Sequence, residues 1–338
     1  MSDYFLQVEA VIRAVRFHSD TSYAWFGQPS PPVNPQARRA LAPEERRDYL
    51  VYSLQQQLYR DFYCQGSATP AEPESLYPSA MLGMTPFVQA LSAANCGAGC
   101  YEEGWKVRAI EDDHLVVQKE RLRIWAPRQD CQVPEGASLA AGTPLRVRFP
   151  KELLNISPGF YMALGDQRLP DGDDQVVIRL YWNLTPQAAA PFVEQATRVL
   201  NQAGLAFRLK VLRDPALYRR CDAAVVYVLK QDYEAVAERL AGVYQEVAPA
   251  LKPATPALTW RLAPGLGLAE DAGYGESFGE NRSRLLAEAL VRAWELGRTS
   301  LEARLQSVVD CFAEEKLRLE APYLGPGSRD EYPFGAPA

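Results

Sequence analysis

Four stretches decide the fold: QVVIRLYWN at residues 175–183, LAFRLKVL at 205–212, DAAVVYVLK at 222–230 and ALTWRL at 257–262. Each alternates in polarity or is rich in β-branched and aromatic residues, which is typical of a β-strand. Helix-like segments at residues 187–203 and 232–248 lie between the first and second stretch and between the third and fourth. The order β-α-β-β-α-β predicts a ferredoxin-like split βαβ sheet over residues 175–262, with four antiparallel strands and both helices on one face.

The alternation assigns the side chains of this sheet to two faces, because successive residues of a strand point to opposite sides. One face is apolar, with Ile178, Leu180 and Trp182 on the first strand, and we expect helices to cover it. The other face is polar and carries Arg179, Tyr181, Asn183, Arg208, Lys210 and Arg261. Such a face can simply be solvated, as is common in antiparallel sheets. It could also bind an anion, because arginine holds phosphate through two parallel hydrogen bonds.

The rest of the chain completes an α+β fold. The spacing of apolar residues predicts a helical N-terminal region, residues 1–95, with helices at 3–16, 44–62 and 85–95. An α+β domain, residues 96–338, follows. Its parts are a small antiparallel unit at 104–150 (strands 104–110, 114–119, 121–126 and 144–149), the split βαβ sheet at 175–262, and a glycine-rich loop with C-terminal helices at 263–338 (helices 281–297 and 301–319).

The glycine-rich segment has the sequence Ala263-Pro264-Gly265-Leu266-Gly267-Leu268-Ala269-Glu270. We expect an Ω-type loop that runs into the helix near Phe278, where Ser277 and Glu280 have the spacing of a capping box. A glycine-rich loop that opens a helix can hold an anion on its free backbone N–H groups, or it can be an ordinary structural loop. It is not a Walker loop, because the Gly-Lys-Ser/Thr ending is absent.

The composition excludes several classes of protein. The chain has 338 residues, of which 47% are hydrophobic, so one large or two closely packed domains are expected. It has no apolar run long enough to span a membrane, and its first residues form no apolar export signal, so we expect a soluble cytoplasmic protein without membrane contacts. With 36 basic and 42 acidic residues, the net charge of −6 disfavours a nucleic-acid-binding protein.

The contents of cysteine and histidine disfavour a metal site. The six cysteines form no disulfide framework in a chain without an export signal. Cys96 and Cys100 are spaced as C-x₃-C, but zinc needs two further ligands, and the whole chain has only two histidines, His18 and His114. We therefore expect neither a metal nor another cofactor, and the scarcity of histidine also disfavours a histidine-based triad.

Several motifs along the chain resemble, in order, landmarks of the HopA-type type III effector family. They are Ser157-Pro158-Gly159-Phe160-Tyr161, Arg179-Leu180-Tyr181-Trp182-Asn183-Leu184, Phe207 to Lys210, Tyr218 through Asp222 to Tyr227, the segment 262–270, Glu276-Ser277-Phe278-Gly279 with Arg282, and Pro322-Tyr323-Leu324. The long glycine-rich motif together with Glu-Ser-Phe-Gly is the most specific part. The resemblance extends over residues 1–335.

This resemblance implies a lyase activity. Relatives take part in the biosynthesis of class V lanthipeptides and thioamitides, where a separate kinase-like protein phosphorylates serine or threonine of a precursor peptide. The HopA-type protein is then assigned the elimination of the phosphate, which leaves dehydroalanine or dehydrobutyrine. The chain has no kinase motifs of its own, so the resemblance implies a phosphorylated precursor peptide as substrate and a separate kinase as partner. The alternative is a non-catalytic, effector-like module that binds a peptide or protein.

The residue types suggest how such an elimination would work. A base must remove the Cα proton, and cations must hold the leaving phosphate. Because histidine is scarce, we assign the base to Lys210, whose pKa we expect neighbouring arginines and burial to depress. Tyr181 and Tyr227 are candidates to donate a proton or to orient the phosphate. The candidate substrate-binding residues are Arg179, Asn183, Arg208, Arg220, Asp222, Gly265, Gly267, Glu270, Glu276, Ser277 and Arg282.

The expected site is a positively charged cleft near residues 263–279. We expect Arg179, Lys210, Arg220 and Arg282 to converge there. These roles follow from residue chemistry and are not transferred from any relative.

Overall fold

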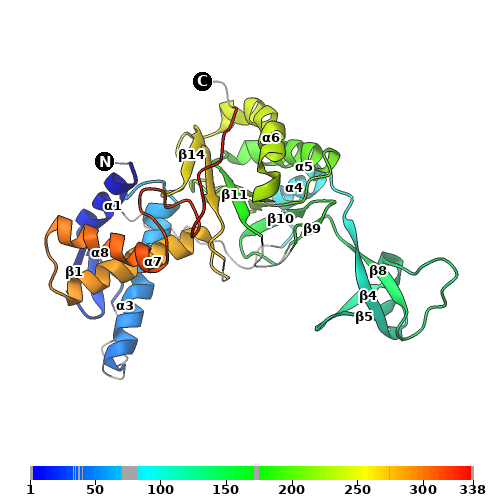
Figure 1. The fold of residues 1–338 in the computed structure, drawn as a ribbon, viewed down its shortest axis with the longest axis horizontal. Helices are drawn as coiled ribbons and strands as arrows, with labels where there is room; N and C mark the ends of the chain where they lie inside the picture. The colour runs from blue at the N-terminus through cyan, green and yellow to red at the C-terminus, as the bar shows by residue number, and fades with distance from the viewer. Residues whose placement is uncertain are drawn as a thin grey trace.

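A computed structural model describes residues 3–32, 34, 36, 39, 41–70, 83–154, 156–170, 175–273 and 275–335. It confirms a mixed α+β fold in which the sheets are antiparallel and helices lie near both ends of the chain (Figure 1). None of the helices in this part of the chain is long and apolar enough to cross a membrane.

The largest sheet has seven strands, in the order β14-β15-β11-β13-β12-β10-β9, and all neighbouring strands are antiparallel. Its strands are β9 (Glu152–Leu153), β10 (Phe160–Leu164), β11 (Val177–Trp182), β12 (Phe207–Leu212), β13 (Ala224–Leu229), β14 (Trp260–Ala263) and β15 (Leu266–Glu270). The four predicted strands are β11, β12, β13 and β14, so their existence is confirmed. The predicted number of strands was wrong, because the sheet has seven strands and not four.

The prediction of an Ω-type loop at residues 263–270 was wrong, because this segment contains β15. This strand lies between β14 and β11, the position that the ferredoxin-like pattern would give to the fourth strand. Gly265 makes the tight turn at a φ of +75°, and a Cβ atom there would lie 2.5 Å from the backbone oxygen of Lys252. At Gly267 a Cβ atom would lie 2.8 Å from Oγ1 of Thr259. The glycines therefore let a buried strand pack closely against the loop before β14.

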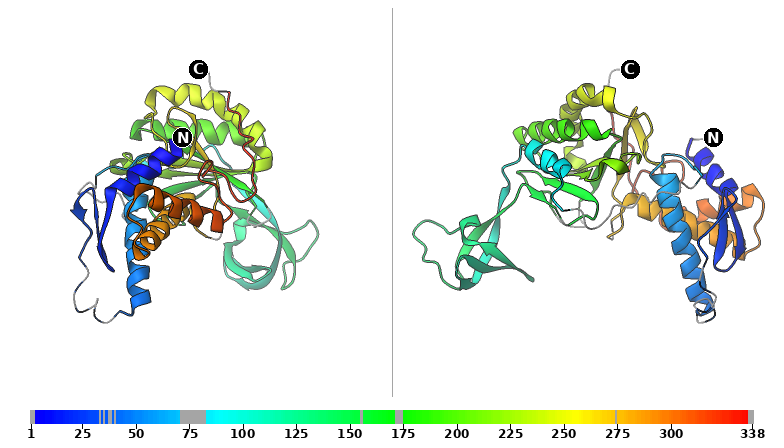
Figure 2. Two further views of the ribbon diagram at one scale, coloured as in Figure 1. Left: turned by 60° about the vertical axis from the view of Figure 1, so that its left-hand side comes forward. Right: turned by 180° about the vertical axis from the view of Figure 1, so that it is seen from behind.

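Two helices cover one face of this sheet, as predicted. They are α5 (Ala189–Gln202) and α6 (Tyr233–Val247), and α4 (Pro86–Ala94) packs beside α5 (Figures 1 and 2). The ring of Trp182 on β11 lies 4.7 Å from that of Phe192 on α5 and 6.2 Å from that of Tyr244 on α6, measured between ring centroids. The predicted apolar face of the sheet is therefore the helix-covered face.

The two ends of the chain form one helical body. Its helices are α1 (Asp3–Ala14), α3 (Pro43–Leu58), α7 (Phe278–Glu295) and α8 (Leu301–Glu314). Helix α7 packs against α3 and α8, and α8 packs against α1, so segments nearly 300 residues apart lie side by side (Figure 1). Helix α3 continues into a π-helical turn, Tyr59–Tyr63.

The N-terminal region is less helical than predicted. A small sheet of β1 (Val15–Ser19), β2 (Ser22–Trp25) and β3 (Gln28–Pro29) follows α1 directly. Its strands are too short to show a clear alternation, so the periodicity of the sequence did not indicate them. Short 3₁₀ turns occur at Arg128–Asp130, Pro186–Ala188, Pro215–Leu217, Lys230–Asp232 and Ala248–Ala250.

A five-stranded sheet forms a separate unit that protrudes from the rest of the molecule (Figures 1 and 2). Its strands are β4 (Cys100–Glu111), β5 (His114–Lys119), β6 (Leu122–Pro127), β7 (Cys131–Gln132) and β8 (Pro144–Phe149). It encloses its own apolar cluster of Trp105, Val107, Leu115, Val117, Ala126, Leu145 and Val147. All four strands predicted for the small unit are present, with a register shift in β4 between Val107 and Ala109.

Candidate functional site

The face of the large sheet opposite α5 and α6 carries five of the predicted site residues in two rows. Tyr227 on β13 is paired with Arg179 on β11 and with Arg208 on β12. In the next row, Val225 is paired with Tyr181 and with Lys210. Paired residues of neighbouring strands point to the same side, so Arg179, Tyr181, Arg208, Lys210 and Tyr227 share one face.

This face is not simply solvated. Arg179 is 7% exposed and Tyr181 is 2% exposed. The ring of Tyr181 lies 6.3 Å from that of Tyr63 in the π-helical turn and 6.5 Å from that of Phe278 at the start of α7. The helical body therefore covers the Tyr181 end of the face. Burying polar groups is costly without partners, so their hydrogen bonds show which of them are already engaged.

Lys210 is held by aromatic rings. Its ammonium nitrogen lies 4.5 Å from the ring centroid of Phe160 and 5.7 Å from that of Tyr227, both within cation–π range. Among the residues that the structure describes, no hydrogen-bond or ion-pair partner of this ammonium group is found. Lys210 is therefore a positioned cation that no carboxylate within the described residues contacts directly.

Arg179 is partly engaged. Its Nη2 donates a hydrogen bond of 2.7 Å to Asp271, and its guanidinium carbon lies 5.1 Å from the ring centroid of Tyr227. Its Nε is buried and has no hydrogen-bond partner within the described parts of the chain. Burial alone would lower the pKa of Arg179, but Tyr227, Tyr181 and Asp271 raise it further than burial lowers it. Arg179 is therefore charged and keeps one donor without an acceptor.

Arg220 and Asp222 form a buried ion pair beside Lys210. Nε and Nη2 of Arg220 donate to the two carboxylate oxygens of Asp222 at 2.8 and 2.7 Å, and Nη2 also donates to the hydroxyl of Tyr59 at 3.1 Å. Burial would raise the pKa of Asp222, but Arg220, with a smaller contribution from Lys210, holds it below its usual value. The guanidinium carbon of Arg220 also lies 5.9 Å from the ring centroid of Phe160. The ammonium group of Lys210 contacts the same ring.

The two tyrosines differ in their surroundings. Burial raises the pKa of the Tyr181 hydroxyl well above its usual value, although the charge of Arg179 opposes this change. Tyr181 is therefore a neutral phenol at pH 7 and can act only as a hydrogen-bond donor or acceptor. Tyr227 is less buried and separates Arg179 from Lys210, with its ring in contact with both cations.

Other predicted site residues hold the C-terminal segment in place. Glu270 is paired with Ile178, so it lies on the helix-covered side of the sheet. It accepts hydrogen bonds from Lys230, Ser328, Tyr332 and the backbone N–H of Gly325. Glu270, a candidate substrate-binding residue, therefore lies on the opposite face of the sheet from Arg179 and Lys210.

Arg282 also binds the C-terminal segment. Its Nε and Nη2 donate to the backbone oxygens of Pro322 and Leu324 at 2.8 and 3.1 Å. Burial lowers its pKa to about 10, so it stays charged at neutral pH. Arg179, Lys210 and Arg220 thus lie along one face, whereas Arg282 donates to the backbone oxygens of Pro322 and Leu324 and to the side-chain oxygen of Asn281.

The remaining candidates make contacts within the fold. Ser277 and Glu280 form the predicted capping box, with Glu280 N–H donating to Ser277 Oγ and Ser277 N–H donating to the Glu280 carboxylate. Glu276 accepts from Arg284. Asn183 donates to the backbone oxygen of Ala254 at 2.9 Å. Gly265 and Gly267 belong to the β14–β15 hairpin described above.

A pocket of about 860 Å³ opens beside the Arg179–Tyr227–Arg208 row. Arg208, whose Nη2 donates to the backbone oxygen of Leu169, lies at its wall together with Arg168 and Asp271. Arg168, Asp271 and Tyr59 were not among the site residues predicted from the sequence. Asp271 directly follows the glycine-rich motif, which was a usable signal, whereas nothing in the sequence distinguishes Arg168 or Tyr59 from surface residues.

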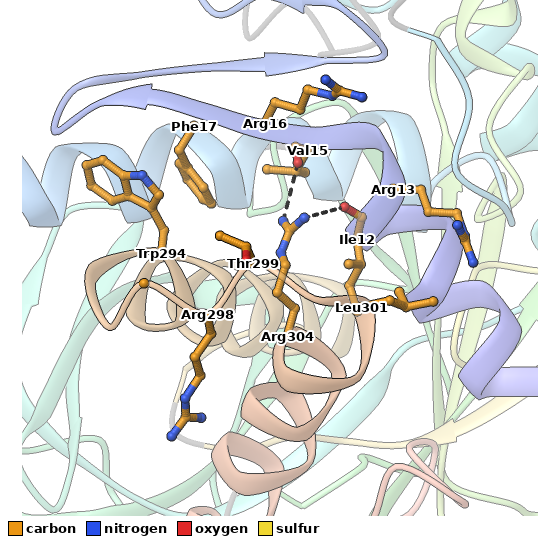
Figure 3. Close-up of a pocket in the computed structure, with 11 residues that line it drawn as sticks. Ile12, Arg13, Val15, Arg16, Phe17, Trp294, Arg298, Thr299, Leu301 and Arg304 are labelled. Carbon is orange, nitrogen blue, oxygen red and sulfur yellow. Dashed lines mark hydrogen bonds between the residues drawn. The ribbon is translucent and has the colours of Figure 1, made fainter.

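A second cavity, of about 770 Å³, lies between α1, β1 and the α7–α8 turn (Figure 3). Its arginines do not converge. Arg304 donates to the backbone oxygens of Ile12 and Val15, Arg298 donates to Ser307, and Arg13 lies 3.8 Å from Glu9. In Figure 3 the side chains of Arg13, Arg16 and Arg298 point away from one another, so this cavity offers no cradle for an anion.

Within the described residues, no group of three or more histidine, cysteine, aspartate and glutamate side chains is arranged to hold a metal ion.

Comparison with known proteins gives the family. The sequence model of the HopA1 effector protein family matches residues 153–324, just over half of the 338 residues, and this range contains every residue of the two rows. No curated protein matches the chain.

Two solved structures match the chain over most of its length. The effector protein from Pseudomonas syringae pv. tomato strain DC3000 is 15% identical, with a TM-score of 0.43, and the match covers 82% of this chain and 97% of that one. The effector protein from Pseudomonas syringae pv. syringae strain 61 is 13% identical, also with a TM-score of 0.43. This match covers 82% of the present chain and 98% of that protein. On the strength of the family match over residues 153–324, the chain belongs to the HopA1 effector protein family.

Proposed function

We propose that the protein is a cytoplasmic lyase that removes phosphate from a phosphothreonine or phosphoserine peptide by β-elimination. The observation that carries this proposal is Lys210, an ammonium group held over two aromatic rings without a carboxylate partner among the described residues. It lies on the same sheet face as Arg179, with the ring of Tyr227 between them. A base and a cation for the leaving group are thus provided by one rigid sheet.

The proposed reaction needs no cofactor. The ammonium group of Lys210 first releases a proton to solvent. Its amine then takes the Cα proton, the C–H electrons form the Cα=Cβ double bond, and the Cβ–O bond breaks with its electrons going to the phosphate. Arg179 stabilises the negative charge that builds up on the leaving oxygen atoms. Tyr227 contacts both cations and can orient the phosphate between them. The products are a dehydrated residue and inorganic phosphate.

The proposed partners follow from this reaction. The substrate must carry phosphate before it arrives, so a separate kinase-like protein has to phosphorylate the precursor peptide. Membrane and nucleic acid have no part in the proposed reaction.

The alternative is a non-catalytic module that binds a peptide or protein. One observation favours it: Arg179 and Arg220 already contact Asp271 and Asp222, so two of the cations offered to a phosphate are neutralised in part. A site of this kind could recognise hydrogen-bonding groups of a peptide without expelling a leaving group.

Mass spectrometry distinguishes the two functions. A phosphothreonine peptide made by the cognate kinase is incubated with the protein, and elimination leaves a product with one water fewer than hydrolysis would leave. Lys210→Ala should reduce turnover by at least about a hundredfold, because it removes the base. Arg179→Ala should mainly weaken binding of the phosphopeptide.

Two matched variants make the test specific. Lys210→Arg keeps the positive charge over the rings but cannot act as a base, so it should be as inactive as Lys210→Ala. Lys106→Ala, at an exposed position of β4, should retain full activity. Release of no phosphate from the kinase product would favour the binding module. Unchanged turnover by Lys210→Arg would show that Lys210 is not the base.

A further inference from the structure

The pocket beside Arg179 combines a charged end with a large apolar wall. Its apolar lining comes from three strands and the loop after β10: Leu153, Met162, Leu164, Leu169, Pro170 and Phe207. Met162 is paired with both Leu153 and Lys210, so this wall continues the face that carries Lys210. The candidate base therefore has an apolar surface immediately beside it.

Part of this wall remains open. Met162 and Leu164 are only partly buried, and Ile156 at the rim is 66% exposed. A cavity of about 860 Å³ is large enough for several residues of a peptide. Partly exposed apolar side chains around such a cavity favour a ligand with apolar groups, because filling it removes apolar surface from water.

The charged end points to an anion. Arg179 is more than nine-tenths buried, lines the pocket, and has an Nε without an acceptor among the described residues. A buried donor is rarely left unpaired in a folded protein unless a ligand or water completes it. Asp271 holds only one nitrogen of the same guanidinium group, through Nη2.

From this arrangement we infer that the pocket recognises a phosphorylated residue together with a bulky apolar side chain next to it. The phosphate binds at Arg179, and the apolar neighbour packs on Met162 and Leu164. The substrate class is thus a phosphopeptide with leucine, isoleucine or phenylalanine adjacent to the phosphorylated residue. This inference rests on the proposed function for its phosphate, and it adds a determinant of specificity that is independent of catalysis.

The test uses the full-length protein and three fluorescein-labelled peptides: one with phosphothreonine between two leucines, one with phosphothreonine between two alanines, and the unphosphorylated leucine peptide. Fluorescence anisotropy gives the dissociation constants. The leucine phosphopeptide should bind at least about tenfold more tightly than the alanine phosphopeptide, a difference typical of apolar subsites. It should also bind more tightly than the unphosphorylated peptide.

Substitutions locate this preference. Met162→Ser should remove most of the difference between the leucine and alanine phosphopeptides and leave the affinity for the alanine phosphopeptide unchanged. Leu164→Ser should do the same, and it replaces Met162→Ser if thermal unfolding shows that the first variant does not fold. The matched control is Leu296→Ser, at a position that is 61% exposed and does not line the pocket, and it should keep the full preference.

The outcomes separate this inference from the proposed function, because the products in the same samples are examined by mass spectrometry. Equal affinity for the leucine and alanine phosphopeptides would overturn the apolar subsite, even if elimination occurs. Equal affinity for phosphorylated and unphosphorylated peptides would overturn the anion site. A clear preference without any dehydrated product would support the pocket and contradict the proposed lyase.

Discussion

The two larger sheets of this protein use their faces in different ways. The seven-stranded sheet is packed against α5 and α6 on one face and is partly covered by the helical body on the other, so Arg179 and the Arg220–Asp222 pair are buried. The five-stranded sheet has one small apolar cluster, and its Trp125 is 72% exposed. The first sheet thus buries Arg179, Arg220 and Asp222, whereas Arg146 and Glu103 of the second sheet are exposed. Substitutions of charged residues should therefore change the free energy of unfolding much more in the first sheet.

The largest difference should come from breaking the buried ion pair. Arg220→Ala leaves the carboxylate of Asp222 buried without its partner, so the free energy of unfolding should fall by about 3–5 kcal/mol. Urea denaturation followed by tryptophan fluorescence measures this change. The matched control in the five-stranded sheet is Arg146→Ala, whose exposed side chain lies 3.9 Å from Glu103 and should contribute less than about 0.5 kcal/mol. Similar losses in both variants would contradict the comparison.

A substitution in the small apolar cluster should show whether that unit unfolds by itself. Trp105 is 1% exposed at the centre of the cluster, and Trp105→Ala should destabilise it by about 3 kcal/mol. Hydrogen exchange should then show faster exchange in β4, β5 and β8 and unchanged protection in β11 and β13. Loss of protection in both sheets would mean that their stabilities are coupled.

The acid sensitivity of the large sheet should depend partly on Glu270. Burial would raise its pKa, but hydrogen bonds from Ser328, Tyr332 and Lys230 lower it below the usual value of 4.5. The folded state therefore binds fewer protons than the unfolded state at acidic pH. The contribution of Glu270 to the free energy of unfolding is complete above pH 4.5 and is lost as the pH falls below that value. Glu270→Gln should flatten the fall in melting temperature below about pH 4.5.

The control for this pH dependence is Glu103→Gln in the five-stranded sheet, where the carboxylate side chain is 80% exposed. It should leave the profile of melting temperature against pH unchanged. An equal flattening in both variants would show that the buried position of Glu270 is not the cause.

The smallest effect should come from Trp125→Ala. Its side chain projects from the outer face of the β6 edge strand, so its removal creates no cavity and should change the free energy of unfolding by less than about 0.5 kcal/mol. Thermal unfolding compares it with Trp105→Ala in the same sheet. A large loss would mean that the outer face of this unit packs against another part of the chain.

Much of the candidate site could be predicted from alternation alone. Arg179, Tyr181, Arg208 and Lys210 were placed on one face because residues two apart in a strand point to the same side, and the register of β11, β12 and β13 puts them there. Glu270 could not be placed this way, because the glycine-rich segment looks like a loop until its pairing with β11 is known. Tyr59 comes from a helix about 160 residues before Arg220, which no local pattern connects.

The sequence by itself therefore determined the central strands β11, β12 and β13 and the helices α5 and α6, which face of these strands is apolar, and which charged residues lie together on the other face. These properties depend on the spacing of residues within a single strand or helix. The tertiary structure decided that β15 enters the sheet beside β11, that the two chain ends form one helical body, and that Arg220 is bound to Asp222 and Tyr59. These contacts join segments that are distant in the sequence. The spacing of residues within one segment does not determine their free energy, because it depends on how the segments pack together.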